Sequence, residues 1–235
     1  MAFNEPEVVR EQYSTETNLQ ARQALWVGAV GDDPKEILWR TLSEWQPRRV
    51  LEVGGGQGEL AERMQRELRA EVTFLDISLR MVELARARGI EAQEGDVQQL
   101  PFPDGSFDTV VAAWMLYHVP DIDRGLAEMA RVLVPGGALV AVTNSVDHIS
   151  ELRDLMAYPP GVFEMSFNSE NGEEMLRRHF AQVERVDTTT TATVHDRATL
   201  VAYRESVSVP SQPIPEDVEL PFVVHGRSTI FFATT

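Results

Sequence analysis

The chain has 235 residues, 43% of them hydrophobic, and this length suits one domain with a full hydrophobic core. A formal net charge of −16, with no cluster of Lys and Arg to interrupt the acidity, excludes DNA and RNA as expected partners. The absence of cysteine excludes disulfides, thiolate metal sites and cysteine nucleophiles, and it favours a reducing, cytoplasmic location.

Membrane and metal signals are missing from the sequence. The first residues are polar and lack the basic and then apolar segments of a signal peptide, and no run approaches about 18 uninterrupted apolar residues. We therefore expect no membrane partner. Metal-ligand spacings are not found either, so no metal is expected, while a monomer and a homodimer both stay open.

Two helical patterns precede the first strand, and we expect residues 1–45 to form an N-terminal helical lid. From about residue 48 to residue 144, apolar and β-branched runs alternate with segments of helical period, which is typical of βαβ units and a parallel sheet. The expected strands are 48–54, 71–77, 90–97, 107–115 and 138–144. The expected helices are 59–68, 78–87 and one near residue 130 that the Pro-Gly-Gly of 135–137 ends.

Beyond residue 144 the pattern loosens. We expect a helix at 147–156, a loop at 157–169, a short helix at 170–180, a strand at 181–194, a helix at 196–207 and a terminal strand at 227–235. The loop and the last helix supply five side chains that either wall an apolar pocket or belong to the outer core, namely Tyr158, Phe163, Met165, Phe167 and Tyr203.

The segment VLEVGGGQGELAERM, residues 50–64, places four glycines within five positions between a strand pattern and a helix pattern. Such a turn presents unpaired backbone N–H groups at the carboxyl edge of a sheet, and glycine lets a ligand approach the backbone closely. The dinucleotide fingerprint would need its third glycine at position 59 or 61, where Glu59 and Ala61 stand. An acidic residue that opens the helix also competes with a pyrophosphate, so the spacing argues against a phosphate ligand.

The pattern Glu52-x-Gly54-x-Gly56-x-Gly58 is the E/D-x-G-x-G-x-G signature, and two further blocks at 95–121 and 128–142 follow it in order. On these motifs the chain resembles the class I S-adenosylmethionine-dependent methyltransferases of the small-molecule type, methyltransferase domain 11-like. The resemblance implies S-adenosyl-L-methionine as cofactor and transfer of its methyl group to an oxygen or nitrogen of a small molecule.

The fold that this resemblance implies is α/β. It is a Rossmann-like, doubly wound, seven-stranded, mostly parallel sheet with helices on both faces and a C-terminal antiparallel strand. Residues 46–235 would form this methyltransferase domain, with a small helical and loop insert near 147–215.

Each expected cofactor contact has a physical reason beside the resemblance. A carboxylate at the end of a strand, such as Asp76, can accept two hydrogen bonds from a ribose diol, although it could instead cap the next helix. Asp96 could accept from an adenine amine or cap its own loop, and Glu52 is costly to bury unless it is satisfied. The expected cofactor-binding residues are Tyr13, Glu52, Gly54, Gly56, Gly58, Asp76, Ile77, Met81, Asp96, Val97 and Trp114.

Methyl transfer from a sulfonium needs positioning above all, and a base only where the acceptor must lose a proton. His118 and His148 follow the fourth and fifth expected strands and are the candidate catalytic residues, with a structural role as the alternative for each. The resemblance implies that Tyr13 covers the sulfonium, and Arg22 could meet a carboxylate of the cofactor or of the substrate. The alternative for both residues is an amphipathic surface segment.

Two other functions stay open at this point. A nicotinamide-dependent oxidoreductase could use a similar sheet, but Glu59 and the missing Tyr-x-x-x-Lys pair disfavour it, because Gly31 stands four residues before Lys35. A module that binds S-adenosylmethionine without transferring its methyl group is equally compatible with the motifs, because methyl transfer has no obligatory side chain.

Overall fold

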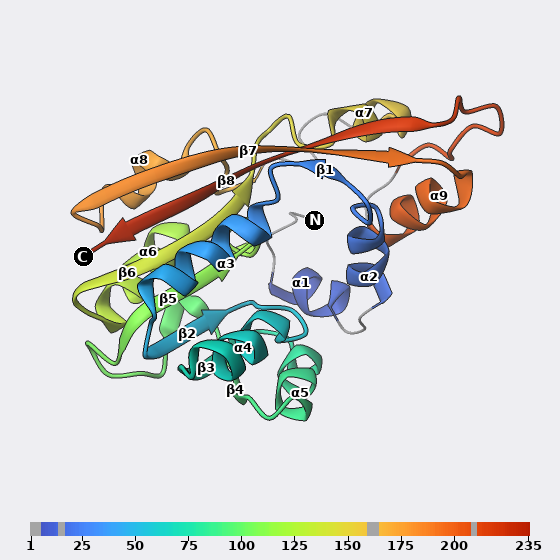
Figure 1. Ribbon diagram of the computed structural model, residues 1–235. Helices are drawn as coiled ribbons and strands as arrows, with labels where there is room; N and C mark the ends of the chain where they lie inside the picture. The colour runs from blue at the N-terminus through green and yellow to red at the C-terminus, as the bar shows by residue number, and fades with distance from the viewer. Residues whose placement is uncertain (1–5, 14–16, 159–164, 208–210) are drawn as a thin grey trace.

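An eight-stranded sheet organises this computed structural model, which describes residues 6–13, 17–158, 165–207 and 211–235 (Figure 1). Its strand order is β1-β7-β8-β6-β5-β2-β3-β4. The strands β2 to β6 pair in parallel, and β1, β7 and β8 are antiparallel to their neighbours. The strands are β1 Val30–Gly31, β2 Arg49–Val53, β3 Glu71–Asp76, β4 Glu91–Glu94, β5 Phe107–Ala113, β6 Leu133–Asn144, β7 Gln182–Val194 and β8 Phe222–Thr234. The predicted α/β class with a mostly parallel sheet is confirmed.

The helices follow the predicted order along the chain, and the first of them is an addition to the two helices expected before the first strand of the parallel sheet. They are α1 Pro6–Gln12, α2 Thr17–Ala24, α3 Pro34–Trp45, α4 Glu59–Arg63, α5 Leu79–Ala87, α6 Ile122–Val132, α7 Ser150–Leu155, α8 Gly172–Leu176 and α9 Arg197–Ser206, with a π turn Met64–Leu68 after α4 and 3₁₀ turns η2 Val97–Gln99 and η3 Leu116–His118. Side-chain oxygens of Asp33, Ser78, Asp121 and Asp196 accept from backbone N–H groups at the start of α3, α5, α6 and α9.

Four details of the sheet differ from the sequence prediction. The eighth strand is β1, whose two residues pair with Thr190 and Thr191 of β7, and so short a long-range pairing leaves no periodic signal. Both β7 and β8 are antiparallel to their neighbours, whereas one antiparallel C-terminal strand was expected. The strand β8 begins at Phe222 instead of the expected residue 227. The Pro-Gly-Gly of 135–137 lies inside β6 as an irregularity of its register with β5, because Phe107 pairs with Leu133 and Thr109 with Ala138.

Alternating strand residues build a hydrophobic core on each face of the sheet. On one face Leu51 of β2 packs with α6 and α8, and on the other Val50 packs with α3, α4 and α5. Because both faces are covered, the central strands are apolar almost throughout, as buried parallel sheets require. The helix α3 falls inside the predicted lid, yet its Leu38 and Leu42 belong to this core, so only α1 and α2 remain as candidates for a cover.

The two C-terminal strands extend beyond the rest of the sheet (Figure 1). β7 pairs with β8 along its whole length, whereas β6 pairs only with the second half of β8, from Ser228 to Thr234. Residues 189–194 and 222–227 therefore form an overhang, the β7–β8 overhang. A third apolar cluster joins this overhang to α7 and α9, and α2 lies beside α9.

Within the described ranges, no helix combines the length and the apolar character needed to cross a membrane.

We expect replacement of Leu126 by Ala to lower the free energy of unfolding by about 2–5 kcal/mol, because the fully buried side chain would leave a cavity between α6 and the sheet. Urea unfolding measures the change. Arg124→Ala on the exposed face of the same helix is the control and should stay within about 0.5 kcal/mol of the unaltered chain. Equal effects of the two replacements would contradict this account of the core.

Candidate active site

A cavity of about 860 Å³ opens at the carboxyl ends of β2, β3 and β5. The chain leaves β2 for β3 on one side and later returns to β5 on the other side, so the connections diverge at this point. Open α/β sheets bind ligands in the crevice at such a divergence. The volume lies near the upper end of the range for small-molecule sites and leaves room for more than one small ligand.

The glycine-rich turn forms one wall of the cavity. Gly54 and Gly56 have φ values of +63° and +59°, in the left-handed region that favours glycine. A Cβ on Gly54 would lie 2.7 Å from the Cβ of Met115. Gly58 has a different place, because it is not among the described lining residues and a Cβ there would lie 3.0 Å from the Cβ of Ala85. Its position suits packing of α4 against α5 rather than the predicted contact with a cofactor.

Glu52 brings a carboxylate to the cavity from the buried strand β2. Only 2% of the residue is exposed, and its Oε2 has no hydrogen-bond partner among the described residues. Burial raises the pKa of Glu52 to about 8, against the opposing effect of a hydrogen bond from the Ala61 backbone, and the nearby Asp76 adds to the rise. A buried acceptor without a partner beside a cavity points to a ligand that carries a donor or a positive charge.

Asp76 lies at the end of β3 and lines the same cavity. Its Oδ1 accepts from the backbone N–H of Ser78 over 2.8 Å, and Ser78 itself caps α5 by accepting from Met81 N. Burial raises the pKa of Asp76 to about 7, although backbone hydrogen bonds from Ser78 and Ile77 oppose the rise. The helix cap that was the alternative for Asp76 is thus Ser78, and Asp76 steadies that cap.

The expected adenine contacts also gather at the cavity. Asp96 lines it and caps η2, because its Oδ1 accepts from Gln98 N over 2.9 Å and both carboxylate oxygens accept from the Gln98 side chain. The loop-capping alternative for Asp96 is therefore present, and its contact with an adenine amine stays a prediction. Met81 and Val97 are buried and Ile77 is half-buried, and all three line the cavity.

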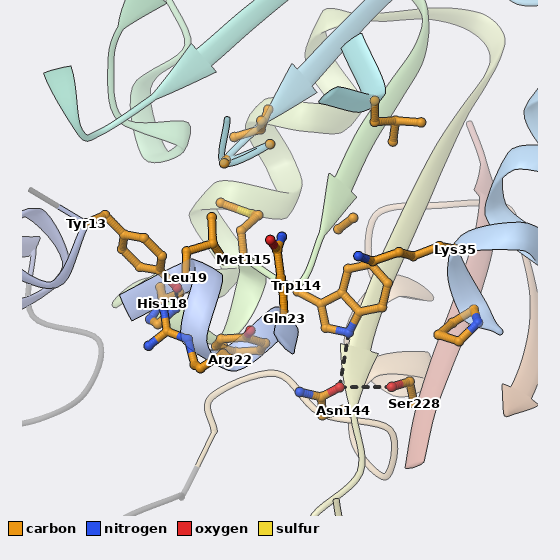
Figure 2. A pocket seen from close by; sticks show the side chains of 18 of the residues that line it. Tyr13, Leu19, Arg22, Gln23, Lys35, Trp114, Met115, His118, Asn144 and Ser228 are labelled. Atoms are coloured by element: carbon orange, nitrogen blue, oxygen red, sulfur yellow. Dashed lines mark hydrogen bonds between the residues drawn. The ribbon is translucent and has the colours of Figure 1, made fainter. Parts of the chain in front are cut away.

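Tyr13 and His118 meet across the cavity although 105 positions separate them (Figure 2). The Tyr13 hydroxyl lies 3.2 Å from His118 Nε2, and the two rings are nearly perpendicular. The Tyr13 carbonyl also accepts from Ser78 Oγ over 2.9 Å, and burial raises the pKa of the Tyr13 hydroxyl. These contacts fasten the segment after α1 to the two strand ends that carry His118 and Asp76.

His148 lines the cavity from the loop before α7, and its Nδ1 lies 3.1 Å from both the carbonyl and the N–H of Arg227. Burial lowers the pKa of His148 to about 4. A group with so low a pKa is a weak general base at neutral pH, so these contacts favour the structural alternative for His148.

Sequence reasoning missed an amide beside the predicted Trp114. Asn144 ends β6, and its Oδ1 accepts from Trp114 Nε1 over 3.1 Å and from Ser228 Oγ over 2.9 Å (Figure 2). Because two donors fix the oxygen, the orientation of the amide is defined, and Nδ2 remains as a donor in the cavity wall. Trp114 itself has a φ of +55°, a strained value for a residue with a side chain. A polar residue at the end of an apolar strand was the signal that could have found Asn144.

The five side chains expected either to wall a pocket or to belong to the outer core are divided between the two places. Met165 and Tyr203 line the cavity, and Phe167 is fully buried in the core cluster of α6 and α8. Tyr158 packs against the third apolar cluster, and Phe163 lies outside the described residues. The two alternatives for this group of side chains are therefore both realised.

Residues 51–141 match the model of a protein family described as the methyltransferase domain, which covers β2 to most of β6. Residues 51–141 are a methyltransferase domain. The match includes Glu52, the glycine turn, Asp76 and His118, so the cavity described above lies at the ligand edge of this methyltransferase domain.

Curated relatives of the methyltransferase domain match part of the chain. Demethylmenaquinone methyltransferase of Deinococcus radiodurans is 44% identical over 101 residues, which are 40% of this chain and 42% of that protein. A ubiquinone/menaquinone biosynthesis C-methyltransferase of Methylobacterium nodulans is 39% identical over 109 residues, 43% of each protein. The chain thus spans less than half the length of either relative.

A solved structure shares the fold over the whole chain. An N-methyltransferase of Haemonchus contortus, in complex with phosphomonomethylethanolamine and S-adenosylhomocysteine, superposes with a TM-score of 0.65 at 17% identity. The alignment covers 100% of this chain and 60% of that one. Since α1, α2 and the β7–β8 overhang lie outside the matched residues 51–141, the methyltransferase domain is only the central part of this fold.

The buried carboxylate of the methyltransferase domain leads to a prediction about stability and pH. The folded pKa of Glu52 is about 8, above its ordinary value of 4.5, so its contribution to stability is complete below about pH 4.5 and is lost as the pH rises through 8. Glu52→Gln should therefore unfold at higher urea than the unaltered protein at pH 8, with a smaller difference at pH 5. Glu71→Gln, an exposed position in β3, is the control. A difference that shrinks as the pH rises would contradict the burial of this charge.

Proposed function

We propose that the chain is an S-adenosylmethionine-dependent methyltransferase that acts on a small molecule. The observation that carries this proposal is the buried Oε2 of Glu52, which has no hydrogen-bond partner in the described part of the chain and lies beside the turn of Gly54 and Gly56 and near Asp76. This part of the cavity, where Glu52 offers an unsatisfied acceptor, lies in the matched methyltransferase domain. Relatives named as methyltransferases support the reaction type.

The residues present fit the proposed cofactor. Glu52 offers an acceptor to its ammonium group, the turn at Gly54 to Gly56 offers backbone close to its amino-acid end, and Asp76 offers an acceptor to its ribose hydroxyls. Met81 and Val97 supply apolar contacts for adenine. The cofactor supplies an activated methyl group on a sulfonium, so the protein needs to contribute position and the removal of water.

The other half of the proposed reaction belongs to the chain's own side chains. Tyr13 and His118 hold each other over the strand ends, where they can exclude water and orient an acceptor. We propose oxygen or nitrogen as the acceptor atom, since His118 Nε2 can take a proton that such an acceptor loses. The relative named as a C-methyltransferase favours carbon as the competing acceptor, and identification of the methylated product separates the two.

The competing functions call for different ligands. Isothermal titration calorimetry with S-adenosylhomocysteine and with NADH tests the cofactor, and binding of NADH alone would contradict the proposal. Incubation with a labelled methyl donor and a panel of small metabolites tests the transfer itself. Binding without transfer to any member of the panel would favour the passive binding module. A cytoplasmic location and a monomeric or homodimeric state remain predictions.

Replacement of Asp76 by Ala should weaken the binding of S-adenosylhomocysteine by about 1–3 kcal/mol, because a buried hydrogen-bond acceptor is lost. Calorimetry measures the change. Glu91→Ala, at an exposed position of β4, is the control and should bind as the unaltered protein does. Unchanged affinity in the Asp76 variant would contradict its contact with the ribose.

Binding of S-adenosylhomocysteine should strengthen between pH 6 and pH 8. Without ligand the pKa values of Asp76 and Glu52 are about 7 and about 8, so a fraction of each is protonated in this range. A cofactor that turns hydroxyls and an ammonium toward them prefers the ionised forms, and its binding releases protons. Calorimetry at three pH values, in buffers that differ in ionisation enthalpy, measures both effects. Affinity that falls with rising pH would contradict this assignment.

A further inference from the structure

The described carboxylates that line the cavity gather mainly in one of its two halves. Glu52, Glu59, Asp76 and Asp96 lie at the ends of β2 to β4 and at the start of α4, which we call the cofactor half, and Lys35 and Arg63 line the cavity on this side too. The opposite half, the acceptor half, lies against α2, α7, α9 and the β7–β8 overhang and carries Arg22 and Arg153. Of the described lining carboxylates, Asp33 approaches this half, because the preceding strand β1 pairs with the overhang. In a chain of net charge −16 this division requires an explanation.

Arg22 is held so that part of its guanidinium stays available. Its Nη1 donates to the Ser206 carbonyl at the end of α9 over 3.1 Å, and its Cζ lies 5.4 Å from the centre of the Tyr13 ring. Its Nη2 is buried without a hydrogen-bond partner, and the described residues place no carboxylate in an ion pair with it. Figure 2 shows Arg22 next to His118 and Tyr13, in the wall of the cavity.

A second unsatisfied group lies in the same wall. Gln12, at the end of α1, is 4% exposed, and both polar atoms of its amide are buried without a partner in the described structure. It lines the cavity immediately before Tyr13. Buried polar groups in proteins nearly always have partners, so two such groups at one wall indicate that a polar ligand completes them.

Trp26, Ile149 and Val207 give the acceptor half an apolar surface. Trp26 packs closely on the overhang, because a Cβ on Gly226 would lie 2.6 Å from its ring, and Trp26 also stacks at a tilt on His148. Ile149 and Val207 complete the lining here. A ligand of this half therefore meets an apolar surface with a cation at one side.

We propose that the methyl acceptor carries an anionic oxygen group on an apolar body, and that Arg22 binds this group and sets the preference for it. The inference rests on the proposed methyltransferase function and adds the chemical class of the acceptor. Arg22 is tied to α9, in the acceptor half, whereas Lys35 reaches the cavity from α3 and extends along Trp114 (Figure 2). Lys35 is thus available in the cavity wall to bind the carboxylate of the cofactor, which leaves Arg22 for the acceptor.

The test compares acids with their uncharged esters. Calorimetry with saturating S-adenosylhomocysteine measures the binding of 2-naphthoate, cinnamate and 4-hydroxybenzoate, each beside its methyl ester. We expect at least one acid to bind about tenfold or more tightly than its ester, and Arg22→Gln to remove about 10- to 100-fold of the acid's affinity while the ester is unaffected. Arg10→Gln, an exposed arginine of α1, is the matched control and should keep the preference.

Each outcome decides a separate statement. Failure of the unaltered protein to bind S-adenosylhomocysteine overturns the proposed function, whereas normal cofactor binding with no acid preferred over its ester overturns only the acceptor class. A loss of cofactor affinity in Arg22→Gln equal to the loss for the acid would assign Arg22 to the cofactor. Should this variant fail to fold, Arg22→Met takes its place, because methionine keeps an unbranched apolar side chain but removes the charge, and an undiminished acid preference there would overturn the role of Arg22.

Discussion

The divergence of the chain on either side of β2 is the constraint on which the site depends. Because β3 and β5 both pair in parallel with β2, the connections that follow β2 and β5 leave the sheet edge in different directions and cannot close over it. The buried strand then delivers Glu52 and the turn of Gly54 to an edge where backbone groups lack neighbours. Burial of the charged form of Glu52 in an apolar sheet is unfavourable unless a partner satisfies it. A ligand with a donor or a positive charge at this edge would supply that partner.

The two halves of the cavity use opposite electrostatics within a few strands of each other. Carboxylates at the ends of β2 and β3 suit a ligand with a positive charge and hydroxyl groups, and burial raises the pKa of both. Across the cavity, Arg22 lies among buried tyrosines, and its charge lowers the pKa of Tyr13 and Tyr117 against the larger effect of burial. In the proposed reaction, Tyr13 stands between the region for the methyl donor and the region for the acceptor.

The sequence predicts the central sheet well because its signals are local. Strand patterns, the spacing from Glu52 to Gly58 and the position of Asp76 all lie within short segments, and the site residues they indicate line one cavity, Gly58 excepted. What the sequence does not reveal depends on contacts between distant segments. The pairing of β1 with β7 and the contact of Arg22 with Ser206 join positions far apart in the chain, and no period or motif marks them. For Asn144 the sequence marks a polar residue at the end of an apolar strand, but not its hydrogen bonds with Trp114 and Ser228.

The β7–β8 overhang gives the molecule a modular construction. The segments that reach the acceptor half, α7, α9 and the tips of the two long strands, lie beyond the part of β8 that pairs with β6, while β2, β3 and β5 pair among themselves. Loops at the tips can therefore lengthen, shorten or be exchanged without altering the register of β2, β3 and β5. Such an arrangement lets the substrate preference of related proteins change while the sheet edge at β2, β3 and β5 stays constant. Exchange of these tips between homologues is therefore a natural starting point for redesign.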